Sequence, residues 1–349
     1  MKIGLGMIVR NEEKDIEACL ESFLPHVDYA VIVDTGSKDK TIDIVKTVAQ
    51  RHPCITSFYS YEAASDSEGR MMNFSQARNR YVEILEQLGV DYIISVDADD
   101  TIDSPIKIRK LIADKKADVY SIDYRMNPNF SFKSYKLWKA RLGIRYTGRV
   151  HEVIQFDWTL HRVEELPVEI LHHSGTHEGQ ECGTVRNMRI LKPEIYPPLR
   201  SLFYWANENV DAKNYDEAIK WYLEYIRRCK AGESAWPVEL AHCYWRAARW
   251  LQHHGRTDES FALSVELIDK DPSWSEALCE LAYISQLKGN WQDMKKFALA
   301  AKSNQYENRL FSEIDKYTTT PEYLYNLAVA LEMSANGLSQ EIGVEPSSN

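Results

Sequence analysis

Three aspartates in the stretch DYIISVDADD (residues 91–100) are the side chains of this sequence best suited to hold a metal ion. Asp97, Asp99 and Asp100 follow an apolar run rich in β-branched and aromatic residues, which predicts a strand buried on both faces. Carboxylates at the end of such a strand repel one another and are costly to desolvate, so a fold tolerates them when a cation neutralises them. Because Asp97 and Asp99 are two residues apart, both can present oxygens to one hard divalent ion such as Mn²⁺ or Mg²⁺.

A nucleotide diphosphate would complete such a site, because these ions keep open positions that phosphate oxygens fill well. Ligands of open α/β sheets bind beyond the carboxyl ends of the strands, where this stretch is expected to lie. The alternative is an acidic turn between the strand and a helix over Ile106–Ala113, with Asp103 or Ser104 as its N-cap. Asp-x-Asp triplets are common by chance, so the stretch alone leaves both interpretations open.

Alternating strand and helix signals surround the acidic stretch. Buried strands are predicted over Ile3–Val9, Tyr29–Val33, Ile55–Tyr61, Tyr92–Val96 and Val119–Tyr124, with amphipathic helices between most of them. This order predicts an α/β domain with a parallel sheet and helices on both of its faces. Shorter strands over Tyr135–Lys139, Val150–Phe156 and Val168–Leu171 predict a small mixed or antiparallel annex that completes the domain.

Helical periodicity dominates the chain after Pro197 and Pro198. Three similar segments begin at Asn214, Arg256 and Asn290. Their spacings, about 42 and 34 residues, match the period of about 34 residues of tetratricopeptide repeats if the first interval contains an insertion. Aromatic residues at helical spacing between them predict a core between repeats. The expected organisation is an α/β domain over residues 1–195, an all-α repeat domain over 199–336 and a flexible polar tail over 337–349.

Composition limits the class of partner and the compartment. The chain has 349 residues and a formal net charge of −10, which argues against a nucleic-acid backbone as its main partner. Its 6 cysteines are scattered without a Cys-x-x-Cys pair, which is typical of reduced thiols in a cytoplasmic protein. No apolar run reaches the roughly 18 residues that a membrane span needs, so any membrane contact is expected to be peripheral.

Four motifs occur in one register: MIVRNEE (residues 7–13), VDTGSKDKT (33–41), Ala-Arg-Asn (77–79) and SVDADD (95–100). Together they resemble the inverting glycosyltransferase family 2, whose members have the Rossmann-like GT-A fold that binds nucleotide-diphospho-sugars. The resemblance covers about residues 1–195. The later segments GRVHE (148–152) and HHSG (172–175) resemble a branch of this family with C-terminal tetratricopeptide-like repeats, which includes bacterial peptide S-glycosyltransferases.

This resemblance implies a set of residues that bind the donor. Val9, Arg10 and Asn11 would contact the nucleobase and ribose, Asp34 would hydrogen-bond the uracil ring or ribose, and Arg78 would lie near the phosphates. Asp99 would ligate the ion directly, and Asp97 would either share in ligation or contact the ribose beside Ala98. His173 would reach the metal or the diphosphate, with His172 as its alternative. The family often has an aromatic residue in place of Arg10, so the identity of the base stays open.

The catalytic base is expected in the GRVHE segment. Inversion requires a carboxylate that takes the proton of the acceptor. Many family members use the aspartate of a Glu-Asp pair, which this sequence lacks, so Glu152 is the predicted base and His151 its orienting residue or alternative. Lys136 lies where relatives often carry arginine, and no role is predicted for it.

The leading expectation is a metal-dependent, inverting transfer of a sugar from a nucleotide-diphospho-sugar, with a UDP-hexose as the expected donor. The acceptor stays open between a peptide or protein, a glycan, a lipid and a modified nucleobase, and the repeats would orient it or join two copies of the chain. Nucleotidyl transfer on the same fold is one alternative, although the segment RNEEK lacks the glycine-rich phosphate loop of that chemistry. A non-catalytic repeat scaffold is another, against which the clustered acids and Asp34 argue.

Overall fold

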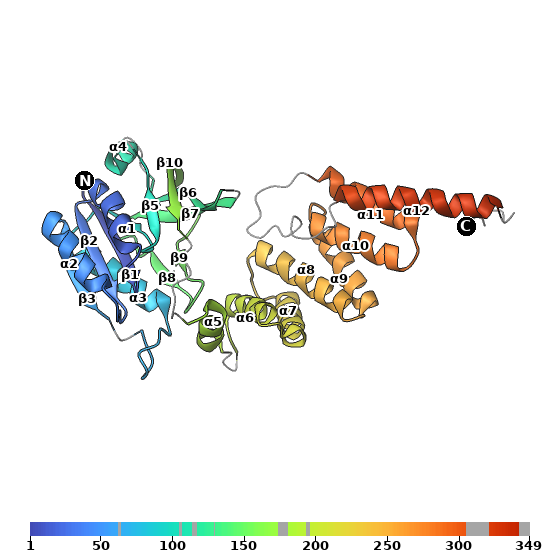
Figure 1. The fold of residues 1–349 in the computed structure, drawn as a ribbon, viewed down its shortest axis with the longest axis horizontal. Coiled ribbons are helices and arrows are strands. Elements are labelled where there is room, and N and C mark those ends of the chain that lie inside the picture. The colour runs from blue at the N-terminus through green and yellow to red at the C-terminus, as the bar shows by residue number, and fades with distance from the viewer. Residues whose placement is uncertain are drawn as a thin grey trace. The chain divides into compact units, whose positions relative to one another are not determined.

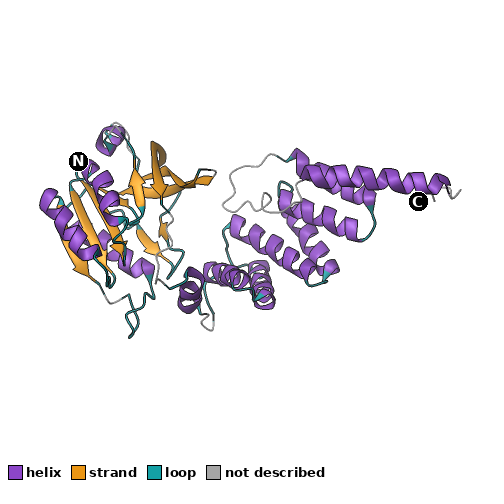
Figure 2. Cartoon of the chain, in the orientation of Figure 1, coloured by secondary structure: helices purple, strands orange, loops and turns teal. Residues whose placement is uncertain are grey.

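The computed structural model describes residues 1–61, 64–104, 107–113, 117–128, 130–173, 181–192, 196–304 and 321–341, without the side chains of 55–60 and 335–341. Contacts along the chain divide it into two compact units, Met1–Leu191 and Lys192–Asn349. The first unit combines strands and helices and the second is helical in its described part (Figures 1 and 2).

The first unit contains one large sheet, one two-stranded sheet and the helices around them (Figure 1). The strands are β1 (Ile3–Val9), β2 (Tyr29–Asp34), β3 (Ile55–Ser60), β4 (Tyr92–Ser95), β5 (Asp100–Ile102), β6 (Val119–Asn127), β7 (Phe130–Lys139), β8 (Arg145–Thr147), β9 (Val153–Gln155) and β10 (Val163–His172). The helices are α1 (Ile16–Phe23), the 3-10 turn η1 (Leu24–His26), α2 (Thr41–Arg51), α3 (Phe74–Gln87), α4 (Ile108–Ile112) and α5 (Gly183–Leu191).

The large sheet has the order β3-β2-β1-β4-β7-β6-β10-β5 and is mixed, so the expectation of a parallel sheet holds only for its first part. Strands β3, β2, β1 and β4 are parallel, whereas β7 runs antiparallel to both β4 and β6. The cause is the short β6–β7 hairpin, because antiparallel neighbours need only a tight turn. Two strands predicted for a separate annex therefore belong to β7 and β10 of the main sheet.

The segment after β4 does not form the acidic turn into a helix that was the alternative interpretation. Asp100 begins β5, which pairs antiparallel with β10. Helix α4 starts later, at Ile108, and its N-cap is Lys107 and neither Asp103 nor Ser104. The predicted strand over Val150–Phe156 is likewise reduced to β9, because the preceding backbone turns through left-handed conformations at Gly148 and His151.

Helices cover both faces of the sheet, and β1 shows how closely they pack. Ile3, Leu5 and Met7 point into the core that also contains the buried side chains of α1. On the opposite face a Cβ atom at Gly6 would lie 2.0 Å from the ring of Tyr81 on α3. Glycine at this position therefore lets α3 lie directly on β1, which brings the start of α3 to the ends of the strands.

The second unit is a series of antiparallel helix pairs. Its helices are α6 (Leu199–Asp211), α7 (Tyr215–Lys230), α8 (Pro237–His253), α9 (Thr257–Lys270), α10 (Ser275–Leu287), α11 (Trp291–Ser303) and α12 (Pro321–Glu341). Each packs on the next along the chain, and α8 also contacts α6 and α10. The three similar segments of the sequence supply the N-caps of the second helix of each pair, Asn214, Arg256 and Asn290.

Aromatic side chains form much of the core between these helices, as the sequence predicted. Tyr222, Tyr244 and Trp245 are buried there, with Trp221 and Trp250 packed at its edge. Helix α12 runs to Glu341, five residues into the segment 337–349 expected to be a tail, and residues 342–349 lie outside the described part.

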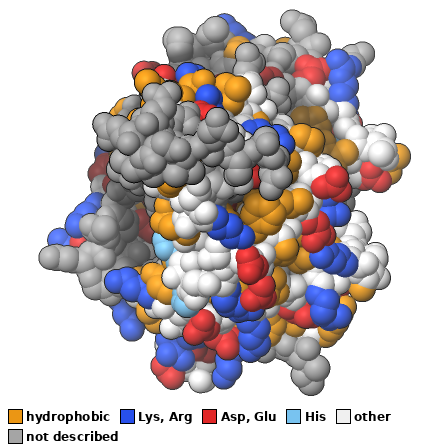
Figure 3. Space-filling model, turned by 90° about the vertical axis from the view of Figure 1, so that its right-hand side faces the viewer, with side chains coloured by type: hydrophobic (Ala, Val, Ile, Leu, Met, Phe, Trp, Pro, Cys, Tyr) orange, Lys and Arg blue, Asp and Glu red, His pale blue; other side chains and the backbone are white. Residues whose placement is uncertain are grey.

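The described surface mixes charges of both signs. Acidic and basic side chains lie among hydrophobic ones over the face shown in Figure 3. Among the described helices, none combines the length and the apolar character that crossing a bilayer requires.

Candidate functional site

The ends of β1, β2 and β4 meet at one edge of the sheet and leave a cavity there. Val9 pairs with Asp34, and Gly6 pairs with Ser95, so the segments after these strands are neighbours. The cavity measures about 540 Å³. Its lining comes from these strand ends, from α3 and the segment before it, and from α5 and the residues before it: Ile8, Val9, Arg10, Asn11, Glu12, Thr35, Arg70, Met71, Phe74, Arg78, Asp97, Ala98, Asp99, Glu181, Arg186 and Arg189. Most of the donor-binding residues predicted from the sequence are thus brought together.

Arg78 on α3 lies between two carboxylates. Its Nε donates to Glu152 Oε1 at 2.6 Å, and its Nη2 donates to Asp97 Oδ1 at 2.6 Å. The guanidinium also lies over the ring of Tyr146. Burial alone would lower the pKa of Arg78, but Asp97 and Glu152 outweigh it and raise this pKa well above its ordinary value. Its Nη1 is buried and has no hydrogen-bond partner among the described residues, so one donor of a fixed cation remains for a ligand.

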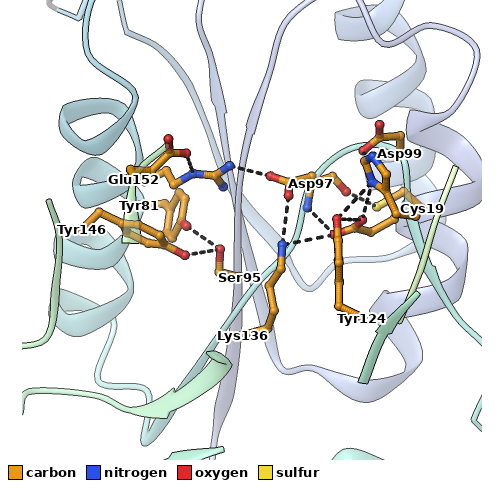
Figure 4. A network of polar contacts seen from close by, with 12 residues as sticks. Cys19, Tyr81, Ser95, Asp97, Asp99, Tyr124, Lys136, Tyr146 and Glu152 are labelled. Atoms are coloured by element: carbon orange, nitrogen blue, oxygen red, sulfur yellow. Dashed lines mark hydrogen bonds and ion pairs between the residues drawn. The ribbon is translucent and has the colours of Figure 1, made fainter. Parts of the chain in front are cut away.

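Lys136 holds the other oxygen of Asp97. Its Nζ lies 2.9 Å from Asp97 Oδ2 and 3.5 Å from Asp100 Oδ2. Burial opposes ionisation of Asp97, yet Arg78 and Lys136 together keep the pKa of this carboxyl well below its usual range. Ion pairs therefore connect a row of side chains with alternating charges, most of which is visible in Figure 4: Glu152, Arg78, Asp97, Lys136 and Asp100.

Asp99, Asp100 and His172 form a cluster that could hold a metal ion. One ligand atom of each lies within 4.8 Å of the others. Asp100 is fully buried, and its Oδ1 accepts a hydrogen bond of 2.6 Å from Tyr124 Oη, while its Oδ2 accepts one of 2.9 Å from the amide of Asp97. Hydrogen bonds to Asp100 and Asp99 raise the pKa of His172 to about 10. Two carboxylates and one imidazole are a donor set that suits Mn²⁺ or a similar divalent ion.

The structure places His172 and not His173 in this cluster. The ladder between β5 and β10 pairs His172 with Asp100, which directs its imidazole toward the acids. The next residue faces the other way, as alternation along a strand requires. His173 donates its amide to the carbonyl of Asp99 at 2.9 Å, and its ring Nε2 lies 2.7 Å from Thr101 Oγ1. Ser174 and Gly175 of the same motif lie outside the described residues.

Two residues predicted to contact the nucleotide shape the loops at this edge of the sheet. Asp34 is buried, and its carboxylate accepts hydrogen bonds from the amides of Gly36 and Ser37 in its own turn. Asn11 has a left-handed backbone with a φ of 57°, and its Oδ1 accepts a 2.7 Å bond from the amide of Lys38. Asp34 is therefore engaged within the loop, whereas Asn11 also lines the cavity.

The GRVHE segment is fixed to the start of α3. Ser75 Oγ donates to the carbonyl of Gly148, and the amide of Phe74 donates to the carbonyl of Arg149 at 2.7 Å. His151 has a φ of 52°, which turns the chain so that Glu152 reaches Arg78. The predicted base, Glu152, thus contacts a residue of the cavity wall, although neither it nor His151 lines the cavity among the described residues.

Sequence reasoning did not identify Glu12 as part of the site and gave Lys136 no role. Glu12 lines the cavity, and burial together with Asp99 raises its pKa to about 8. Four arginines, Arg10, Arg70, Arg186 and Arg189, line it as well. Of these four arginines only Arg10 was predicted from the sequence, because it directly follows a buried strand. The other three reach the cavity through burial and contacts between distant parts of the chain.

Comparison with known proteins assigns a family to the first unit. Residues 5–159 match the model of glycosyl transferase family 2. Together with the mixed sheet and its cavity, this match confirms the GT-A fold predicted for the first unit.

Two curated relatives extend the comparison. The SPbeta prophage-derived glycosyltransferase SunS of Bacillus subtilis is 26% identical over 247 residues, which is 65% of this chain and 54% of that protein. A TPR repeat-containing protein of Synechococcus elongatus is 24% identical over 206 residues, 54% of this chain and 46% of that protein. This chain therefore spans about half the length of the curated relatives it matches. The second relative and the paired helices confirm the predicted tetratricopeptide-like repeats.

Among solved structures, the TPR2B domain of yeast Sti1 in complex with pHsp70 aligns with a TM-score of 0.31 and 20% identity, over 38% of this chain and 96% of that one. MamA aligns with a TM-score of 0.30 and 12% identity, over 35% of this chain and 66% of that one.

Proposed function

We propose that this chain, whose residues 5–159 form a glycosyl transferase family 2 domain, moves a sugar from a nucleotide-diphospho-sugar to an acceptor with inversion at the anomeric carbon. The observation that carries the proposal is the fixed Arg78 beside the cluster of Asp99, Asp100 and His172 at the end of β4. A departing nucleoside diphosphate needs positive charge at its phosphates, and this edge of the sheet can concentrate it.

The residues that would hold a divalent ion are Asp99, Asp100 and His172, with Asp97 contacting the ribose or a water near the ion. Their oxygen and nitrogen donors fit Mn²⁺ or Mg²⁺, and the buried charge of Asp100 supports a cation at this place. When bound, such an ion would neutralise charge that develops on the leaving diphosphate.

Arg78 would donate to an oxygen of the diphosphate. Its guanidinium is held at Nε and Nη2, and the buried Nη1 has no partner among the described residues. A donor that is already oriented stabilises the leaving group without the cost of ordering it during the reaction. Val9, Arg10 and Asn11 would bound the nucleoside end of the cavity.

Glu152 is the proposed base. Its Oε1 accepts the bond from Arg78, which orients the carboxylate and leaves Oε2 as the oxygen that takes the proton of the acceptor. His151, in its left-handed turn, would orient Glu152 from the adjacent position.

The proposed donor is a UDP-hexose and the proposed acceptor a peptide or protein, with a glycan as the next candidate. The relative named glycosyltransferase SunS and the repeat-containing relative support a transferase joined to a protein-binding arm. The same arm would orient the acceptor or join two copies of the chain.

A donor-hydrolysis screen over UDP-, GDP- and dTDP-sugars with Mn²⁺ tests this function, with the acceptor then sought by mass spectrometry. We expect release of one nucleoside diphosphate by the wild type. Asp99→Ala should lose that release, and Glu152→Gln should lose transfer while it retains affinity for the nucleotide. The proposal is wrong if no donor is consumed, or if Asp99→Ala consumes it at the wild-type rate.

A further inference from the structure

We propose that Lys136 is a positioning residue that keeps Asp97 out of the coordination of the metal ion and thereby limits the affinity of the site for that ion. This inference rests on the proposed function, because it concerns the same ion site. It assigns a task to a buried lysine whose role neither the sequence nor the family match indicates.

An irregularity in β7 presents Lys136 to the site. Tyr120 pairs with Leu137, and its neighbour Ser121 pairs with Tyr135, so the ladder between β6 and β7 skips Lys136. Such a bulge inserts one residue into a strand and re-aims its side chain. The side chain of Lys136 is only 12% exposed, which makes its charge costly unless carboxylates compensate it.

The lysine completes a clamp on Asp97. Its Nζ lies 2.9 Å from Asp97 Oδ2, and Arg78 Nη2 holds Asp97 Oδ1 at 2.6 Å. Both oxygens of Asp97 are therefore bound by cations. The cluster able to hold a metal ion consists of Asp99, Asp100 and His172 and does not include Asp97 within the described residues.

The lysine also lies against the metal cluster itself. Its Nζ is 3.5 Å from Asp100 Oδ2 and 4.5 Å from the centroid of the Tyr124 ring, whose hydroxyl donates to Asp100 Oδ1. A fixed ammonium at this distance competes with a divalent cation for Asp100 and repels it. Lys136 thus opposes binding of the ion in two ways, by its own charge and by holding Asp97.

Loss of the Lys136 charge is expected to change the affinity for the ion and the rate of sugar transfer in opposite directions. Removing the charge of Lys136 should tighten binding of the ion, because Asp97 Oδ2 becomes free to ligate it and the repulsion disappears. Sugar transfer should nevertheless slow, because Asp97 then no longer holds Arg78 in place for the leaving group. A lysine that only supports the fold would behave otherwise, since its loss would loosen Asp100 and weaken the ion site.

The test is a titration of the full chain with Mn²⁺, followed by electron paramagnetic resonance, with and without UDP. We expect Lys136→Met to bind Mn²⁺ on the order of tenfold more tightly than the wild type while its kcat falls at least about tenfold. Lys136→Arg should restore the wild-type affinity. Lys139→Met, which removes a half-exposed lysine of the same strand, is the matched control and should change neither quantity.

Unchanged or weaker binding of Mn²⁺ by Lys136→Met would overturn the inference. A thermal melt checks that Lys136→Met folds. If Lys136→Met does not fold, Lys136→Gln takes its place, because glutamine keeps a hydrogen-bond donor without the charge. A wild type that consumes donor and binds Mn²⁺, with variants that bind it no more tightly, refutes the role of Lys136 alone. A wild type that binds no Mn²⁺ refutes the ion site and this inference together.

Discussion

Arg78 shows how much of the site depends on hydrogen bonds between residues far apart in the sequence. Its two carboxylate partners come from the end of β4 and from the turn before β9, and Tyr146 from β8 lies against its guanidinium. Arginine suits this position because its planar fork makes two fixed bonds and still presents a third donor. A lysine cannot reproduce that arrangement, because its ammonium is a single compact charge on a flexible side chain.

Arg78→Lys is therefore expected to lower kcat by on the order of 100-fold, because a lysine cannot join Asp97 to Glu152 and also contact the diphosphate. The binding of Mn²⁺ should change little, since Arg78 is not a member of the metal cluster. Steady-state kinetics and a Mn²⁺ titration measure the two effects. Arg80→Lys, on the exposed side of the same helix, is the control. Equal activity of Arg78→Lys and the wild type would contradict the proposed contact.

The sequence indicated which residue types form the site but not every residue that does. The acidic stretch and Arg78 were identified from motifs, and both lie at the cavity. The choice between His172 and His173 depends on the pairing of β10 with β5, a strand that the sequence did not predict. Glu12 lies within the MIVRNEE motif, but its role and that of Lys136 could not be predicted, because they follow from burial and from a bulge in β7.

At the scale of elements, local patterns predicted the strands and helices better than their pairing. Strands β1 and β2 lie where periodicity predicted them, and helix α6 begins at Leu199, directly after the Pro197-Pro198 pair. The prediction of a parallel sheet was wrong for the part that contains β7, because nothing in the local pattern of β7 shows that it lies between β4 and β6. The order of the strands depends on how the whole core packs, and local sequence patterns carry no information about that packing.

Helix α10 carries a buried carboxyl that should make the stability of the second unit depend on pH. Burial raises the pKa of Glu280 from 4.5 to about 7, and its Oε1 has no hydrogen-bond partner among the described residues. The folded protein therefore favours the protonated form of Glu280 more than the unfolded chain does. The free energy of unfolding is highest below about pH 4.5 and falls as the pH rises through about 7.

Between pH 5 and pH 8 the free energy of unfolding should therefore decrease by up to about 3 kcal/mol more in the wild type than in Glu280→Gln. Urea unfolding of the full chain, followed by the circular dichroism of its helices, measures this difference. Glu259→Gln, at an exposed position of α9, is the control and should keep the wild-type dependence. Identical slopes for the wild type and Glu280→Gln would show that Glu280 does not titrate in this range.

At the scale of the whole molecule, the chain joins a unit that matches the model of glycosyl transferase family 2 over residues 5–159 to a series of helix pairs. Each unit has its own hydrophobic core, which is typical of domains that can vary independently. The first unit contains the cavity and every residue proposed for catalysis. The choice of acceptor is therefore the property we expect to depend most on the second unit.

The most direct test of the account is calorimetric titration of the full chain with UDP, in the presence of Mn²⁺ and after removal of divalent ions with EDTA. The account predicts that Mn²⁺ strengthens UDP binding by at least about tenfold and that Asp99→Ala abolishes this gain, because the ion joins the nucleotide to the cluster at the end of β4. Equal UDP affinity with and without Mn²⁺, or a full gain in Asp99→Ala, would contradict it.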